Sequence, residues 1–144
     1  MVYTTDNYFI NIISNGQLIS SSNPLAEIDV IHFGIDIKST EQLMSVLGWD
    51  IQNFAQAIGT NVKTLGLYKK ESRRLSITLS ENAIELAKIA SICMAYFKSK
   101  EYWNIWLDNP NSQFDNKAPR AFIGLIKGRE LIYKTVQSLN LNKP

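Results

Sequence analysis

Residues 50–65 read DIQNFAQAIGTNVKTL, two short helical segments joined by a tight turn. Ala55 supplies the small residue that is needed where two helices cross, and Gly59 tolerates the positive φ of a sharp turn. Leu65 and Tyr68 supply apolar anchors on the second segment. This spacing predicts a helix-turn-helix, although a plain helical hairpin that binds no DNA has the same spacing. The second helix is expected to expose Val62, Lys63, Gly66, Leu67 and Lys70.

Residues that commonly begin and end helices recur from residue 23 onward. We expect helix caps at Asn23, Ser39 or Thr40, Asp50, Asn61 and Thr78, the last of these opening a Thr78-x-x-Glu81 capping box. Pro119 fits the first turn of a further helix, and Gly128 begins or interrupts the last one. The sequence therefore predicts an all-α fold.

The first 22 residues follow a different pattern. Residues 8–13 read YFINII, which favours β structure, and Asn15-Gly16 is a hairpin turn signal. A run of serines follows at residues 20–22. We expect either a short β-hairpin or a flexible arm at residues 1–22, and the sequence leaves the choice open.

Composition places the chain among ordinary globular proteins. It has 144 residues, of which 45% are hydrophobic and 19% charged, so it can bury a sizeable core without a metal or disulfide. Cys93 is the single cysteine, which excludes an internal disulfide. We see no secretory signal and no apolar run of the ~18 residues that a membrane span needs, and therefore expect a soluble, cytoplasmic protein that contacts no membrane.

The net charge of +2 is unevenly distributed along the chain. Residues 1–62 contain six acidic residues and one lysine, whereas residues 63–144 contain fourteen basic and seven acidic residues. Clustered positive charge favours a polyanion partner, although a solvated helix face followed by a basic loop explains the same pattern. The candidate DNA-binding residues are Asn61, Lys63, Thr64, Lys69, Lys70, Arg73 and Arg74.

Residues 106–128, WLDNPNSQFDNKAPRAFIGLIKG, contain the most specific pattern. This stretch resembles the C-terminal toxin-binding domain of the Xre/MbcA/ParS family of antitoxins, which also begins with a helix-turn-helix. The resemblance covers roughly residues 24–141, with Asn116 at the family's turn glycine. The positions that match in order and without a gap are Trp106, Leu107, Pro110, Asn111, Phe114, Pro119, Ile123 and Gly128.

The resemblance implies a type II toxin–antitoxin system. It assigns residues 23–77 to a DNA-binding region and residues 78–144 to a helical region that masks the active site of a cognate toxin, of the NAD-consuming RES class. It also implies binding to the chain's own operator DNA to repress transcription, as a homodimer or larger complex with toxin, without a cofactor. The residues expected to contact the toxin are Asn111, Gln113, Lys117, Arg120, Lys127, Arg129, Lys134 and, through its terminal carboxylate, Pro144.

The apolar residues of this C-terminal region are expected to form a small core. We predict that Trp106 is largely buried among the last helices, together with Leu107, Phe114 and Ile123. On the final helix, Ile132, Val136 and Leu139 have the spacing of an inward face. A partner surface would then occupy the remaining faces of the same helices.

Enzyme chemistry has little support in the sequence. His32 is the single histidine, and Cys93 lies on the apolar face of an expected helix, where packing is its usual role. The sequence shows no metal-ligand cluster and no phosphate-binding glycine loop. We expect no catalytic residues. Two alternatives to an antitoxin stay open, namely a helix-turn-helix regulator without a toxin, whose C-terminal region serves oligomerisation, and a protein-interaction module that has lost DNA binding.

Overall fold

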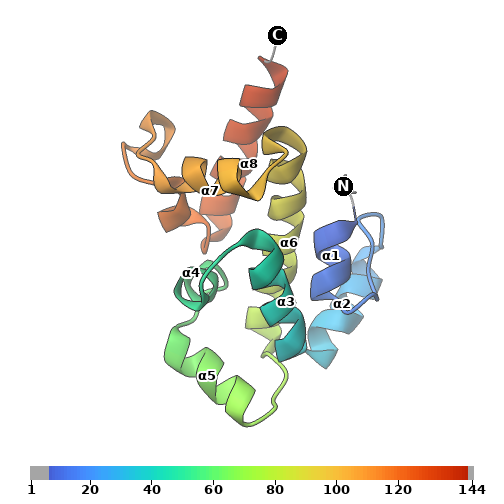
Figure 1. Cartoon of the computed structure of the whole chain (residues 1–144). Helices are drawn as coiled ribbons and strands as arrows, with labels where there is room; N and C mark the ends of the chain where they lie inside the picture. The colour runs from blue at the N-terminus through green and yellow to red at the C-terminus, as the bar shows by residue number, and fades with distance from the viewer. Residues whose placement is uncertain (1–6, 143–144) are drawn as a thin grey trace.

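The structure is a computed structural model that describes residues 7–142, and throughout this range it confirms the all-α fold (Figure 1). No strand occurs in the range, and a single antiparallel bridge joins Asn111 and Lys117. None of the helices described is long and apolar enough to cross a bilayer. The elements are α1 (Tyr8–Ile13), α2 (Pro24–Phe33), α3 (Ile37–Leu47), α4 (Ile51–Ala57), α5 (Val62–Lys70), α6 (Ile77–Phe97), α7 (Lys100–Asp108), the 3-10 helices η1 (Ser112–Phe114) and η2 (Pro119–Phe122), and α8 (Ile126–Leu141).

Three of the described helices, α2, α4 and α5, begin at the caps that the sequence predicts. The side chains of Asn23, Asp50 and Asn61 each accept a hydrogen bond from the backbone N–H three residues later, at 2.8–2.9 Å. Two expected caps are wrong. Asp36 caps α3, because Ser39 and Thr40 are buried inside the helix, where the Thr40 hydroxyl donates to the Ile37 carbonyl. Ser76, rather than Thr78, caps α6.

The N-terminal segment is neither a hairpin nor an arm over the residues that the structure describes. Residues 8–13 form α1, whose Phe9, Ile10 and Ile13 are almost fully buried against α6 and α3. The predicted turn at Asn15 and Gly16 is present, with φ of 54° and 81°, but it follows a helix. Burial of one apolar face against α6 outweighs the β preference of the isoleucines, because such preferences are weak compared with tertiary packing.

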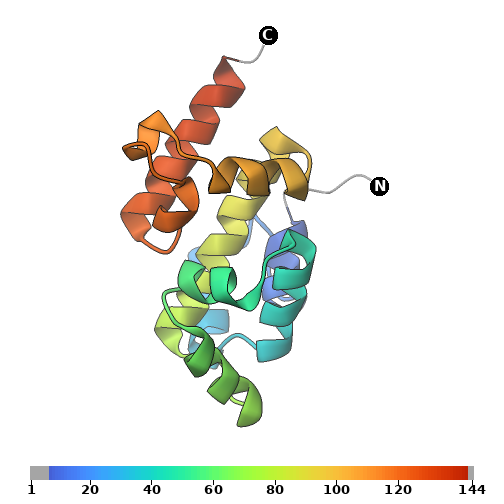
Figure 2. The same ribbon diagram turned by 60° about the vertical axis from the view of Figure 1, so that its left-hand side comes forward.

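The long helix α6 is the centre of the fold. Ala83, Ala87 and Ala90 are completely buried on it, and these small residues let neighbouring helices approach closely. α1, α2, α7 and α8 all pack against α6, and one continuous core extends from Phe9 to Val136. Figures 1 and 2 show α5 at one end of the molecule and the C-terminal end of α8 at the other.

Trp106 is partly buried and packs against the core, and Trp103 is the completely buried tryptophan of α7. Trp103 is completely buried against Trp49, with ring centroids 5.7 Å apart, whereas Trp106 is half-buried. Trp106 instead packs edge-on against Phe114 of η1. Ile132 and Val136 of α8 face the core as expected, but Leu139 is exposed because α8 extends beyond α6 at that point.

Candidate functional site

The helix, turn and helix predicted for residues 50–70 are present as α4 and α5. Ala55 is buried, and Gly59 has a φ of 84° in the turn. The Thr60 N–H donates to the Ala55 carbonyl at 2.9 Å and closes that turn. Leu65 and Tyr68 are buried and hold one face of α5 against the body.

The opposite face of α5 is open to solvent. It exposes Val62, Lys63, Gly66, Leu67 and Lys70, as the sequence predicts. Among residues 7–142, no ion pair involves Lys63 or Lys70, whereas Lys69 pairs with Glu41 of α3 at 2.8 Å. Neither ammonium group therefore has an acidic partner among the described residues.

Two glutamines that the sequence reasoning missed lie beside this face. Gln52 and Gln56 are exposed on α4, and with Thr60, Asn61, Val62 and Lys63 they line a shallow hollow between the two helices. Gln52 and Gln56 are four residues apart on the side of the helix opposite Phe54 and Ala55, and this spacing could have predicted that both are exposed. Asn61 and Thr64, both expected to contact DNA, are partly committed to the fold, since the Asn61 side chain accepts the Thr64 N–H at 2.8 Å.

The two arginines of the basic cluster are held by the protein itself. Arg73 pairs with Glu71 at 3.1 Å and lies over the ring of Tyr68 at 4.9 Å. Arg74 donates to the Gly34 carbonyl at 3.0 Å, and its guanidinium lies 4.1 Å from the ring centroid of Phe33. Arg74 thereby attaches the segment after α5 to the end of α2 and has a structural role there.

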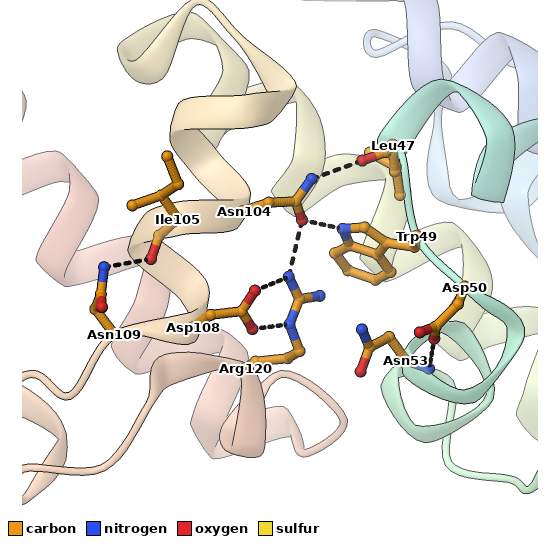
Figure 3. Close-up of polar contacts among 9 residues, drawn as sticks. All are labelled: Leu47, Trp49, Asp50, Asn53, Asn104, Ile105, Asp108, Asn109 and Arg120. Carbon is orange, nitrogen blue, oxygen red and sulfur yellow. Dashed lines mark hydrogen bonds and ion pairs between the residues drawn. The ribbon is translucent and has the colours of Figure 1, made fainter.

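Arg120, which the sequence predicts to be an exposed contact for a toxin, is instead largely buried. Its side chain is 11% exposed, and it makes a bidentate ion pair with Asp108 at 2.6 and 3.2 Å (Figure 3). Arg120 also donates to the Asn104 side-chain oxygen at 2.8 Å, which accepts the indole N–H of Trp49 at 2.6 Å. Since Asn104 donates in turn to the Leu47 carbonyl, these bonds join α7 and η2 to the segment between α3 and α4.

Arg129 is also a structural residue, again contrary to the prediction. It is 6% exposed and donates to the Ile123 carbonyl at 3.1 Å and to the side-chain oxygen of Asn82 at 3.2 Å. Asn82 donates to the Ile58 carbonyl at the end of α4. Burial lowers the pKa of Arg129, and the nearby charges of Glu85 and Glu81 oppose that shift. The C-terminal region therefore contacts the segment before α4 through Asn104 and the end of α4 through Asn82.

The remaining predicted toxin contacts are more open, but they do not form one cluster with the arginines. Gln113, Lys117, Lys127 and Lys134 are exposed, with Lys127 lying 3.5 Å from Glu130. Asn111 is half-buried, and its side chain accepts the Gln113 N–H, which stabilises the turn at η1. Asp115 and Asn116 both adopt positive φ in this turn, which confirms the expected role of Asn116. Pro144 lies outside the described residues.

Exposed apolar side chains in the C-terminal region were not singled out from sequence. Tyr102 and Ile105 are 66% and 57% exposed on the outer side of α7, and Leu125 and Ile126 are exposed where α8 begins. The sequence spacing could have indicated this exposure. Tyr102 and Ile105 lie three residues apart, on the side of the helix away from Trp103 and Leu107. Large exposed apolar residues near polar ones are common at protein interfaces.

The residues considered for catalysis do not form a site in the described part of the chain. Cys93 is completely buried, and burial raises the pKa of its thiol, so no thiolate forms near neutral pH. His32 is exposed on α2. Among residues 7–142, no three His, Cys, Asp or Glu side chains are grouped so that they could hold a metal ion.

Comparisons with known proteins add no relative. Neither the models of known protein families nor the curated proteins contain a match to this chain.

Proposed function

We propose that this chain is a cytoplasmic antitoxin of a type II toxin–antitoxin system that also represses its own transcription. In this proposal α4 and α5 bind operator DNA, and the outer surface of α7, η1 and α8 binds and masks a cognate toxin of the NAD-consuming RES class. The chain contributes no catalytic residue and needs no cofactor. It acts as a homodimer or as a larger complex with toxin.

The observation that carries this proposal is the solvent-facing side of α5. Val62, Lys63 and Lys70 project outward from a helix that Leu65 and Tyr68 hold against the core. A helix-turn-helix places the N-terminal part of its second helix in the major groove, where apolar groups contact thymine methyls and amides contact adenine. Val62 and the neighbouring Gln56 have this chemistry, and the two lysines suit phosphates.

The toxin-binding half is supported by the apolar residues of the C-terminal region. Tyr102 and Ile105 offer an exposed aromatic and an aliphatic anchor on a rigid helix. Interfaces are commonly built from such anchors surrounded by polar residues, and Lys117, Lys127 and Lys134 are the exposed cations of this region that we assign to the rim. An inhibitor of this kind needs shape and contact area rather than chemistry of its own.

DNA binding is tested by salt titration with a duplex from the chain's own promoter. We expect the logarithm of the binding constant to fall linearly with the logarithm of salt concentration, with a slope of about −0.9 for each phosphate neutralised. Lys63→Ala combined with Lys70→Ala should flatten that slope, whereas Lys134→Ala, at the other end of the molecule, should leave it unchanged. A wild-type chain whose binding to this duplex is independent of salt contradicts the DNA-binding half.

Toxin binding is tested by co-expression with the product of the neighbouring gene, with cell growth and NAD content as readouts. Tyr102→Ala combined with Ile105→Ala should lose protection, and the pair Lys63→Ala and Lys70→Ala should retain it. Deleting residues 128–144 is a poor test, because Ile132 and Val136 belong to the core. Full protection by the α7 variant contradicts the assignment of that surface.

A regulator without a toxin is the second candidate, and one observation favours it. Arg120 and Arg129, the two arginines expected at the toxin, are both engaged inside the molecule. Under this alternative the C-terminal region only positions α4. The same co-expression experiment separates the two candidates, since a regulator binds its promoter but protects against no neighbouring gene product.

A further inference from the structure

A hollow of about 420 Å³ lies between α6 and α8, which pack against each other. Its apolar wall consists of Ile89 and Ile92 of α6 and of Ile126 and Tyr133 of α8. Ile126 and Tyr133 are 70% and 36% exposed and Ile92 is half-buried, so the wall is open to an incoming group. Ligand pockets commonly have volumes of roughly 300–1,000 Å³ and combine such apolar walls with a few polar groups.

Three carboxylates surround this apolar wall. Glu81 and Glu85 lie on α6, and Glu130 lies on α8. Residues 63–144 contain fourteen basic and seven acidic residues, yet three of those seven acidic residues line this one hollow. Among residues 7–142, Glu81 makes no ion pair, and Glu130 pairs with the exposed Lys127 at 3.5 Å. The hollow therefore presents negative charge within a basic half of the chain.

The two cations that line the hollow are both paired inside the molecule. Arg129 is 6% exposed and donates to a backbone carbonyl and to the side-chain oxygen of Asn82. Lys88 lies 2.8 Å from Glu27, which is outside the hollow, and 3.2 Å from Glu85. The two other carboxylates of the hollow therefore remain for an incoming group.

We propose that this hollow binds a small organic cation, an amine whose apolar body lies on the isoleucines and Tyr133 and whose ammonium group pairs with Glu81 and Glu130. The apolar wall favours a ligand with a hydrophobic body over a fully hydrated inorganic ion. The carboxylates favour an ammonium head over a hydroxyl or a carboxylate head. This inference uses neither the DNA contact nor the toxin contact proposed above.

A second hollow indicates where the apolar body of the ligand extends. It has a volume of about 530 Å³ and shares Lys88, Ile92 and Tyr133 with the first, so the two form one groove between α6 and α8. Its other lining residues are uncharged, namely Ile10, Ser20, Ser91, Ala95, Gln137 and Asn140. The groove is thus acidic at one end only. A linear amine with a single charged end matches it better than a polyamine that carries charge along its length.

The inference is tested with octylammonium, octanol and octanoate, which share one alkyl chain and differ in the charge of the head. Each is titrated into the full chain while NMR follows the isoleucine methyl groups. We expect octylammonium to shift the signals of Ile89, Ile92 and Ile126. It should bind at least about fivefold more tightly than octanol, because a carboxylate about 4 Å away contributes that factor even at the dielectric constant of water. Octanoate should bind more weakly than octanol.

Three results of this titration overturn the inference. Equal binding of the three molecules would mean adsorption of the alkyl chain alone. Shifts confined to isoleucines elsewhere, such as the exposed Ile105 of α7, would place the binding site outside the groove. Octylammonium that leaves the three groove signals unchanged at millimolar concentration would mean that no amine binds there.

Charge-removing variants test the role of the carboxylates. Glu81→Gln combined with Glu130→Gln should abolish the preference for octylammonium over octanol. Glu101→Gln combined with Asp115→Asn removes the same charge from exposed residues outside the groove and should leave the preference unchanged. Ile126→Ser should weaken octylammonium and octanol by similar factors, since it removes part of the apolar wall. An equal loss of preference in both charge-removing pairs overturns the inference.

A toxin segment is the other occupant that the groove could accept, and the same variants distinguish it. The titrations contain no DNA and no toxin, so their results do not depend on the proposed function. If no amine binds, and Glu81→Gln combined with Glu130→Gln abolishes protection in the co-expression experiment, the groove is a toxin surface and the inference is wrong.

Discussion

The α5 end of the molecule and its C-terminal region both contain basic residues, but they use them in different ways. At α5, Lys63 and Lys70 point into solvent from a helix anchored by two buried residues. In the C-terminal region, Arg120 and Arg129 point inward and donate to acceptors on α6, on α7 and in the segment after η2. The contrast follows side-chain chemistry, because the planar guanidinium makes several directed hydrogen bonds, whereas the ammonium is compact and strongly hydrated.

This difference shows how a positive residue in a sequence should be interpreted. An arginine near carbonyl and carboxylate oxygens can serve as an internal crosslink, as Arg129 does with partners on both of its terminal nitrogens. A lysine on the open side of a helix has no such partners and remains available to a ligand. The cations at the α5 end are therefore open to a ligand, whereas in the C-terminal region it is the apolar Tyr102 and Ile105 that are exposed.

The largest expected effect tests the structural role of α7. Trp103→Ala should lower the free energy of unfolding by ~3–5 kcal/mol, because it removes the completely buried ring by which α7 packs against Trp49. Trp106→Ala should cost about 1–2 kcal/mol, since Trp106 is half-buried. Urea unfolding of both variants measures the difference. A larger loss for Trp106 would contradict the packing described for α7.

The next effect tests whether Arg129 is an internal crosslink. Arg129→Met should lower the free energy of unfolding by about 2–3 kcal/mol, because the Ile123 carbonyl and the Asn82 amide lose a charged donor while buried. Lys127→Met, two residues away and 91% exposed, serves as the control and should stay within about 0.5 kcal/mol of wild type. Equal stability of the two variants would mean that Arg129 is a surface residue after all.

A smaller difference in stability is expected between variants of two basic residues at the α5 end, Arg74 and Lys70. Arg74→Ala should cost about 1 kcal/mol, because it removes the hydrogen bond to Gly34 and the contact with Phe33. Lys70→Ala should leave the thermal unfolding midpoint near that of wild type. Should Lys70→Ala prove the more destabilising change, α5 would have tertiary contacts that its exposure does not indicate.

The smallest expected effect is on the stability of the fold at alkaline pH, through Lys88 of α6. Burial lowers the pKa of Lys88, but its hydrogen bond to Glu27 and the charge of Glu85 outweigh burial, so the pKa lies above its usual value of 10.5. The pairing therefore stabilises the fold below pH 10.5, and this contribution is lost as pH rises through the folded-state pKa. Unfolding of wild type and Lys88→Met between about pH 9 and 11.5 should show a shallower decline in the variant. Parallel declines would contradict this contribution.

Local signals along the chain predicted most of the helices and several of their ends. Asn23, Asp50 and Asn61 cap helices because the chemistry of a cap involves residues three positions apart, which a sequence displays directly. The turn at Gly59 and the outward residues of α5 were predicted for the same reason. At the start of α6, Ser76 is the cap instead of the predicted Thr78, so the prediction was off by two residues.

Tertiary packing decided what local signals could not. Residues 8–13 became a helix because α6 offers Phe9 and Ile13 a buried site that neither a hairpin nor an arm would provide. Trp103, rather than Trp106, is the completely buried tryptophan of α7, because its ring packs against Trp49, a residue more than fifty positions away in the sequence. The side chains of Arg120 and Arg129 turned inward because Asn104 and Asn82 lie within reach only after α6, α7 and α8 have packed. The sequence by itself determined most of the helices and the open basic face of α5, whereas long-range contacts determined the helical state of α1 and which arginines, tryptophans and apolar side chains are buried.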